Sequence, residues 1–282
     1  MMCRDFILPE TALYVLFYLR NLLDLTCHNT AADNSSVKPE LVKAYTGDIP
    51  VDMDTVYINM SDGLTQIYSR VQIPVLCDML GIKYSGSGPF EVALMTNKHY
   101  TKLAVREHGV LCPKGAVVTP GYFDTPPVKD WTYPVMLKPN TEGSSVGITQ
   151  NNVCFSQKDL LLRLSELLRE FSEIIVEEYV PGADATCLLL GNPSCYALNE
   201  VLLVEHHGKR FFQNEVIEMA DHAHKRTAYV MADDILPNSV VEEIKQITIT
   251  AAQALNVHDI VRVDYRVTKD NKISSRQIQF QE

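Results

Sequence analysis

The sequence predicts an α/β or α+β fold. Short segments rich in β-branched and aromatic residues alternate with segments whose apolar residues recur at helical spacing. The 282 residues, 46% of them apolar, suffice for about two domains with cores of their own. With 25 basic and 35 acidic residues the net charge is −10, which argues against a nucleic-acid-binding protein or one that binds an anionic membrane.

The first 50 residues give little evidence of function. Residues 11–19 (TALYVLFYL) are about half as long as a membrane span, so we interpret them as a buried helix, with a signal peptide as the alternative. Residues 28–50 are polar and rich in turn formers, as in a loop or linker. The seven cysteines form no C-x-x-C pair, so they indicate neither a zinc site nor a redox dithiol. Their odd number fits reduced thiols and a cytoplasmic location.

The next elements form a strand-loop-helix unit. Residues 55–60 (TVYINM) predict a strand, and the apolar spacing over 71–80 predicts a helix that Gly81 closes. A short strand at 81–84 then leads through SGSGP into one helix that ends at Gly109. Lys98 and Lys102 lie one turn apart on this helix, a spacing typical of a solvated face.

The middle of the chain continues the alternation. We expect a strand at 133–138, a loop at 140–147 and a helix at 157–171, opened by Ser156 and Asp159 in capping-box spacing. The apolar residues of this helix are expected in the core: Leu160, Leu161, Leu164, Leu167, Leu168 and Phe171.

The last third predicts three more strands and one helix. The strands are expected at 174–179, around 187–190 and at 260–267. The helix should begin at Ser239, with Glu242 completing a second capping box, and run toward Leu255.

One segment has the chemistry of a phosphate-binding loop. Lys138 ends a predicted strand and is followed by EGSSVG, in which glycines allow close backbone approach while amides and hydroxyls donate hydrogen bonds. The segment is not a Walker loop, because G-x-x-x-x-G-K-[ST] is absent. The alternative is a hairpin turn beside a surface lysine.

Two acidic segments suggest further contacts. EEYVPG at 177–182 could expose backbone groups to an adenine edge, and Asp184 could accept hydrogen bonds from ribose hydroxyls; an acidic strand end with a turn is the alternative. Arg262 and Asp264 share one strand face, so the arginine could stabilise developing negative charge while the carboxylate binds Mg²⁺. An ion pair along the strand is the alternative.

Two histidine-containing segments, at 206–207 and 221–224, look like metal ligands at first sight. They lack a partner cysteine or an H-E-x-x-H frame, so we interpret them as solvent-facing. No G-x-S-x-G elbow is present to support a nucleophilic hydrolase.

Four segments in order resemble the D-alanine-D-alanine ligase branch of the ATP-grasp superfamily: GIKYSGSGPFEVALMTNKHYTK, YPVMLKPNTEGSSVGIT, IIVEEYVPGADAT and VRVDY. The resemblance covers about residues 55–282. It implies an ATP-dependent carboxylate-amine ligase that forms a peptide-type bond through an acyl phosphate. The residues that it implies for ATP binding are Lys98, Lys138, Glu142, Gly143, Ser144, Ser145, Val146, Gly147, Glu177, Glu178, Tyr179, Val180 and Asp184.

The resemblance also implies catalytic roles for Arg262 and Ser144, and Mg²⁺ or Mn²⁺ ligands at Asp264 and Glu282. The substrates would be a small-molecule acid and amine, amino acids by analogy, and homodimers are common among such ligases. The implied lobes are N-terminal (1–95, of which 1–50 are atypical), central (96–180) and C-terminal (181–282).

Several departures from the family pattern leave a second function open. The glycine-rich first loop is missing, NMSDG at 59–63 replaces a segment associated with D-alanine, and the family's loop lysine falls on Ile217, with Lys225 nearby. No asparagine follows Glu282. We therefore expect a truncated C-terminal lobe, and keep as the alternative a catalytically impaired ATP-binding protein or fragment.

Overall fold

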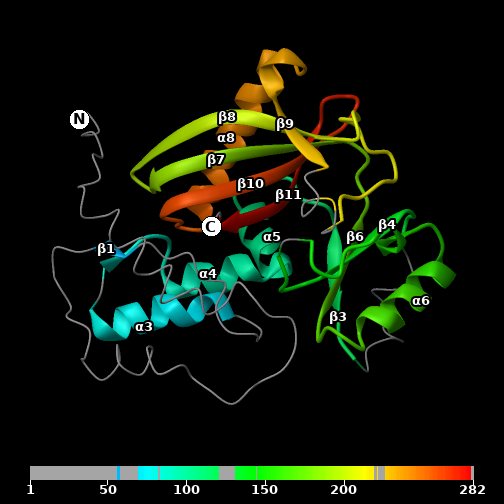
Figure 1. Ribbon diagram of the computed structural model, residues 1–282, viewed down its shortest axis with the longest axis horizontal. Helices are drawn as coiled ribbons and strands as arrows, with labels where there is room; N and C mark the ends of the chain where they lie inside the picture. The colour runs from blue at the N-terminus through cyan, green and yellow to red at the C-terminus, as the bar shows by residue number, and fades with distance from the viewer. Residues whose placement is uncertain are drawn as a thin grey trace.

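The protein is an α+β structure in which antiparallel sheets pack against helices (Figure 1). The computed structural model describes residues 56–57, 69–81, 83–120, 131–143, 145–218, 221 and 226–280, without the side chains of 56–57, 69 and 275–280. The predictions for residues 1–50 lie outside this part of the chain. Of the two predicted classes, α+β is the one observed, because neighbouring strands in both larger sheets are antiparallel.

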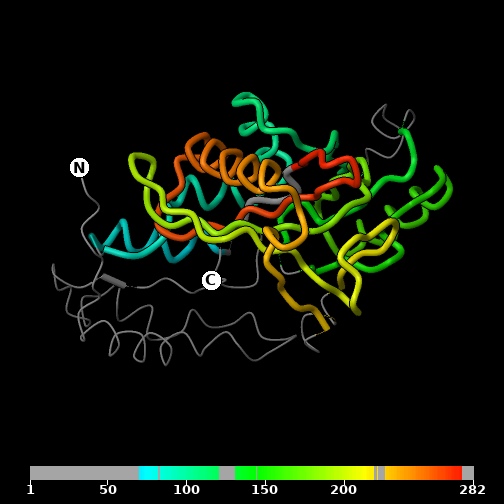
Figure 2. The backbone as a smooth tube through the Cα atoms, turned by 90° about the horizontal axis from the view of Figure 1, so that it is seen from above, coloured from blue at the N-terminus to red at the C-terminus, as the bar shows by residue number. Residues whose placement is uncertain are grey.

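The five-stranded sheet has the order β11-β10-β7-β8-β9. Its strands are β7 (Ala183–Asn192), β8 (Cys195–His206), β9 (Thr227–Met231), β10 (Asp259–Val267) and β11 (Ile273–Phe280). Helix α8 (Asn238–Ala254) runs along one face of this sheet (Figure 2). The largest core cluster forms there, where Ile244 and Ala251 pack with Val261 and Tyr265.

The four-stranded sheet has the order β3-β6-β4-β5. It consists of β3 (Gly115–Val118), β4 (Val135–Pro139), β5 (Val153–Cys154) and β6 (Ile174–Glu178). Helix α6 (Gln157–Leu167) covers it, with Leu160, Leu164 and Leu167 buried. Ser156 caps this helix as predicted, since its Oγ accepts the Asp159 amide at 3.2 Å. Leu161 is 38% exposed, so its prediction as a core residue is wrong.

The N-terminal described segment contributes a parallel strand pair and three helices. The pair is β1 (Val56–Tyr57) and β2 (Lys83–Tyr84), and the helices are α3 (Gln72–Leu80), α4 (Pro89–Thr96) and α5 (Lys98–Arg106). Gly81 ends α3 at φ +65°, as predicted. The single helix expected up to Gly109 is two helices, because Asn97 takes an extended conformation and its side chain caps α5 through the Tyr100 amide.

Other predictions need smaller corrections. Helix α8 begins at Asn238 after Pro237 and has no side-chain cap, so the box predicted from Ser239 is absent. Strands β3, β5, β8, β9 and β11 were not predicted. Short 3₁₀ turns occur at Ser69–Val71, Gln150–Asn152 and Ala232–Asp234. The proposed lobe boundaries stay predictions.

The cysteines and the helices of the described residues bear on the predictions about thiols and membrane spans. The described cysteines are free thiols: Cys77, Cys112, Cys154, Cys187 and Cys195. Within the described residues, none of the helices combines the length and apolar character that a membrane crossing requires.

Candidate nucleotide site

Three lysines and one glutamate meet in the protein interior. Lys98 and Lys102 come from α5, Lys138 from β4 and Glu177 from β6, and each is at most 7% exposed. Antiparallel pairing of β4 and β6 places Lys138 and Glu177 diagonally on one sheet face. Lys138 Nζ lies 2.5 Å from Glu177 Oε1, and Lys102 Nζ pairs with the other carboxylate oxygen. We call these four residues the lysine cluster.

Burial and charge together set the protonation of the lysine cluster. Burial alone would raise the pKa of Glu177, but Lys102 and Lys138 outweigh it and lower the pKa to about 2. Burial, reinforced by Lys138 and Lys102, lowers the pKa of Lys98 to about 7. Lys102 and Lys138 therefore share one carboxylate, which leaves an excess of positive charge suited to an anion, and an anion would favour the protonated form of Lys98 as well. The prediction that Lys98 and Lys102 lie on a solvated face is wrong.

Lys98 also fixes the start of the predicted phosphate loop. Its Nζ donates to the carbonyl of Pro139 at 2.9 Å and to that of Glu142. The loop then turns, with the Val146 amide donating to the Gly143 carbonyl at 2.9 Å. The segment expected to cover phosphates therefore begins beside a buried lysine.

Glycine is required at the end of this loop. Gly147 has φ +71°, and a Cβ there would lie 2.8 Å from Pro139 Cγ and 2.9 Å from the Phe171 ring. Ser145 also has a positive φ, +59°. Ser144, predicted both to bind ATP and to act in catalysis, lies outside the described residues.

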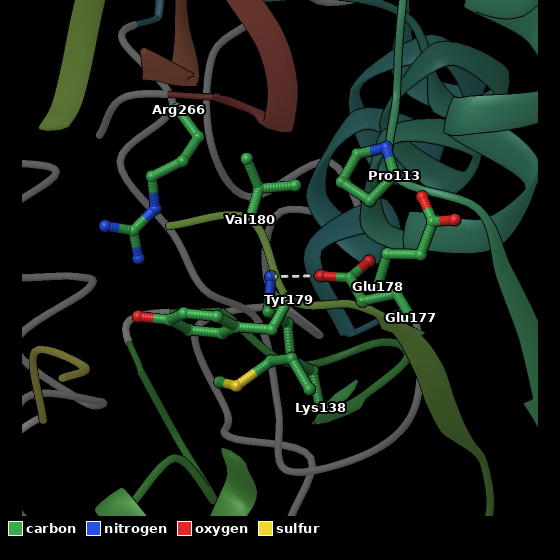
Figure 3. A pocket seen from close by; sticks show the side chains of 8 residues that line it. Pro113, Lys138, Glu177, Glu178, Tyr179, Val180 and Arg266 are labelled. Atoms are coloured by element: carbon green, nitrogen blue, oxygen red, sulfur yellow. Dashed lines mark ion pairs between the residues drawn. The ribbon is translucent and has the colours of Figure 1, made fainter. Parts of the chain in front are cut away.

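A pocket opens beside the lysine cluster (Figure 3). The chain leaves β6 through Glu178, Tyr179 and Val180, and the Arg266 side chain extends from β10 toward the Tyr179 ring. The remaining lining residues are Pro113, Met136, Lys138 and Glu177. The pocket thus joins a charged wall to an apolar and aromatic one, a combination typical of small-molecule sites.

Two contacts hold the aromatic wall in place. The Tyr179 hydroxyl donates to the Glu215 carbonyl at 2.9 Å, which fixes the outer end of the ring. The Arg266 guanidinium carbon lies 5.7 Å from the Tyr179 ring centre and 5.6 Å from that of Phe212. The predicted adenine-binding segment is therefore braced by residues from later strands and loops.

Strand β10 carries a row of alternating charges on one face. Arg262 Nε lies 3.0 Å from Asp264 Oδ1, which also accepts the Thr186 hydroxyl at 2.9 Å. The ion pair along the strand, our alternative interpretation, is therefore present. Asp264 remains 26% exposed at its side chain, and a partly exposed carboxylate is the oxygen ligand that Mg²⁺ prefers. The donor type thus fits the expected ion.

Arg266 continues this row and meets the predicted ribose carboxylate. Its Nε lies 3.2 Å from Asp184 Oδ1, and its Nη1 donates to the Gly182 carbonyl at 3.0 Å. Arg266 was not among the predicted site residues, although it stands at the next same-face position after Asp264. Lys102 was not among the predicted site residues either.

The predicted site residues therefore fall into three groups. Lys98, Lys138 and Glu177 belong to the lysine cluster, and the Glu142 carbonyl accepts from Lys98. The loop that follows contains Gly143, Ser145, Val146 and Gly147. Glu178, Tyr179 and Val180 line the pocket, and Asp184 is linked to it by Arg266. Arg262 and Asp264 form the neighbouring pair, while Ser144 and Glu282 lie outside the described residues.

This chain matches a known protein family. Residues 102–279 match the family model described as D-ala D-ala ligase C-terminus. A D-alanine--D-alanine ligase of Halalkalibacterium halodurans is 29% identical over 227 residues, covering 79% of this chain and 69% of the relative. One of Cupriavidus metallidurans is 27% identical over 198 residues, covering 70% and 58%.

Solved structures show the same fold. The D-alanine--D-alanine ligase from Bacillus anthracis complexed with ATP has a TM-score of 0.65 at 17% identity, covering 97% of this chain and 83% of that one. The VanG D-Ala:D-Ser ligase from Enterococcus faecalis also gives 0.65, at 19% identity, covering 80% and 63%. The chain spans roughly three fifths to four fifths of the lengths of these relatives. Because the family model matches more than half of it, the chain belongs to the D-alanine-D-alanine ligase family of ATP-dependent, peptide-forming ligases, and its fold is ATP-grasp.

Proposed function

We propose that this chain binds ATP between its two larger sheets and joins two small amino acids, with D-alanine the first acid and amine to test. The observation that carries the proposal is the lysine cluster beside the pocket, where buried cations exceed carboxylates. The relatives are named for D-alanine, and one neighbour was solved with ATP.

We base the proposed orientation of the nucleotide on the charges around the pocket. Lys98 and Lys138 would contact phosphate oxygens, together with backbone amides and hydroxyls of the 143–147 loop. The base would lie in the pocket against Tyr179 and Val180, and the ribose toward Asp184. In this arrangement Arg266 would hold the Asp184 carboxylate in place for the ribose hydroxyls.

The reaction would proceed in two displacements. The first substrate's carboxylate attacks the γ-phosphorus of ATP, and ADP leaves. The amine then attacks the resulting acyl phosphate, and inorganic phosphate leaves. Arg262 is the residue suited to stabilise the tetrahedral oxyanion, and Ser144 would contact the reacting groups from the loop.

We also propose a binding site for a divalent metal ion. Asp264 and Glu282 would hold Mg²⁺ or Mn²⁺ together with phosphate oxygens, and the ion would supply charge neutralisation at the phosphates. We also propose that the chain forms homodimers and is located in the cytoplasm. Measurement of its size in solution tests the first of these proposals, and cell fractionation tests the second.

The direct test is product formation by the purified chain. ATP, Mg²⁺ and D-alanine should give dipeptide and phosphate, and omitting either the amino acid or ATP should abolish both products. Lys138→Met should reduce the rate at least a hundredfold, whereas Lys158→Met, on the exposed side of α6, should leave it unchanged. Equal rates in both variants would refute the assignment of Lys138.

One observation favours the second candidate, an ATP-binding protein without turnover. Ile217 is only 7% exposed and apolar where the resemblance expects a lysine, so the loop before β9 supplies no charge at that position. Stoichiometric nucleotide binding without product for a panel of amino acids and amines would support this candidate. Dipeptide formation would exclude it.

A further inference from the structure

A second cluster of ligand-type side chains lies outside the nucleotide pocket. His206 ends β8, His207 follows it in the turn, and Asp221 comes from the segment that precedes β9. One ligand atom from each residue lies within 4.8 Å of the other two. The prediction that these histidines face solvent fails for His206, whose side chain is 14% exposed.

The backbone presents both histidines from a tight turn. His206 and Lys209 exchange backbone hydrogen bonds of 2.9 and 3.0 Å, which close a two-residue loop. The two loop residues, His207 and Gly208, have φ values of +50° and +72°, as in the mirror-image turns that suit hairpins. The ring centres of the two histidines are 4.3 Å apart.

His206 directs a buried ring nitrogen at Asp221. Its Nε2 is buried and makes no hydrogen bond, although it lies 3.3 Å from Asp221 Oδ1. The 3.3 Å contact is an ion pair that is long for a hydrogen bond, and it is close to the separation of two ligand atoms held by one zinc ion. The opposite carboxylate oxygen is already oriented, because Asp221 Oδ2 accepts the Glu218 amide at 3.0 Å.

We propose that His206, His207 and Asp221 bind a divalent transition-metal ion, with Zn²⁺ the best match. Two imidazole nitrogens and one carboxylate oxygen are ligands that Zn²⁺ accepts, and a water molecule completes a tetrahedron. Mg²⁺ is disfavoured because it prefers oxygen ligands in octahedral geometry.

Only modest movement is needed to close the site. Zinc ligands lie about 2.0–2.2 Å from the ion, so the three atoms must approach one another, and exposed His207 can rotate toward the two buried partners. Arg226 lies 3.3 Å from Asp221 Oδ1 and competes for it, but its side chain is 47% exposed and can swing into solvent.

The position of the cluster indicates a structural role. The segment between the turn and Asp221 contains Phe212, whose amide and carbonyl bond to Gly182 at 2.9 and 3.0 Å, and Glu215, whose carbonyl accepts the Tyr179 hydroxyl. A metal ion would tie the two ends of this segment together and so rigidify one wall of the pocket. No residue of the metal site is assigned to the nucleotide, so the proposal does not rest on the proposed function.

The test is metal titration of the full chain after treatment with a chelator. Calorimetry with Zn²⁺, in competition with a chelator of known affinity, should show a site that His207→Gln and Asp221→Asn each weaken at least about tenfold. The control is His108→Gln, because His108 is an exposed histidine that follows α5 and is not part of the cluster; this variant should bind Zn²⁺ as the parent does. Circular dichroism confirms that each variant is folded.

Spectroscopy identifies the ligands. Co²⁺ bound at the proposed site should absorb as a nitrogen- and oxygen-ligated ion without a thiolate band, and that absorption should disappear in the two site variants. Zn²⁺ affinity that is the same in His207→Gln, Asp221→Asn and His108→Gln would overturn the proposal, as would a thiolate band for the tightest ion. If Asp221→Asn does not fold, His207→Gln alone decides, because His207 is exposed and its replacement removes no buried contact.

Discussion

Replacing Glu177 by glutamine should destabilise the protein far more than the loss of one surface charge. The change leaves Lys102 and Lys138 without their shared carboxylate in an environment where both are 5% exposed. Breaking a buried ion pair from one side costs about 3–5 kcal/mol. The depression of the Glu177 pKa from 4.5 to about 2 corresponds to about 3 kcal/mol, in agreement with that range.

The assay is urea unfolding near neutral pH, followed by circular dichroism. Glu177→Gln should lower the free energy of unfolding by about 3 kcal/mol. The matched control is Glu166→Gln, because Glu166 pairs with Arg163 but its side chain is 47% exposed, so its loss should cost below about 1 kcal/mol. Since the folded-state pKa of Glu177 is lowered, its contribution is complete above pH 4.5 and disappears as the pH falls toward 2.

A double variant separates charge from packing. Adding Lys102→Met to Glu177→Gln removes one of the two orphaned cations, so part of the lost stability should return. A Glu177→Gln loss no larger than that of Glu166→Gln would refute the reasoning. So would a double variant whose loss is the plain sum of the two single losses.

Three further predictions follow from neighbouring contacts. Gly147→Ala should lower the free energy of unfolding by at least about 2 kcal/mol and weaken nucleotide binding, because Gly147 has φ +71° and the new Cβ would meet Pro139. Unchanged unfolding curves would contradict this prediction. Tyr265→Phe should cost about 1–2 kcal/mol, since the hydroxyl is buried and lies 2.7 Å from Thr248 Oγ1; thermal unfolding measures it. Because the pKa of Lys98 is lowered to about 7, the protein should take up a proton when it binds a nucleotide anion at pH 8. Calorimetry in buffers of different ionisation enthalpy detects this proton uptake, and Lys98→Met should abolish it.

Local chemistry predicted much of the secondary structure. Gly81 and Ser156 ended and began helices as expected, because their effects depend on residues within one turn. The break at Asn97 was missed, since an amide capping the next turn resembles any polar residue within a helix until its partner is known. Strand β8 was missed because its outward and inward residues do not separate cleanly into polar and apolar positions.

Long-range pairing explains the errors at the site. Lys102 has the spacing of a surface lysine, and its burial depends on Glu177, which is 75 residues away in the chain. Arg266 likewise gains its role from Asp184, 82 positions earlier, through the register of β7 and β10. The ordered motifs predicted the family, while the partners of each charged side chain required the fold.

The central claim is that the lysine cluster and its pocket form a nucleotide site. The most direct measurement is calorimetric titration of the chain with Mg²⁺ and a non-hydrolysable ATP analogue, comparing the parent with Lys138→Met and Lys158→Met. We predict one site per chain, lost in Lys138→Met and unchanged in Lys158→Met. Equal affinity in all three folded proteins, or binding by none of them, would contradict the claim.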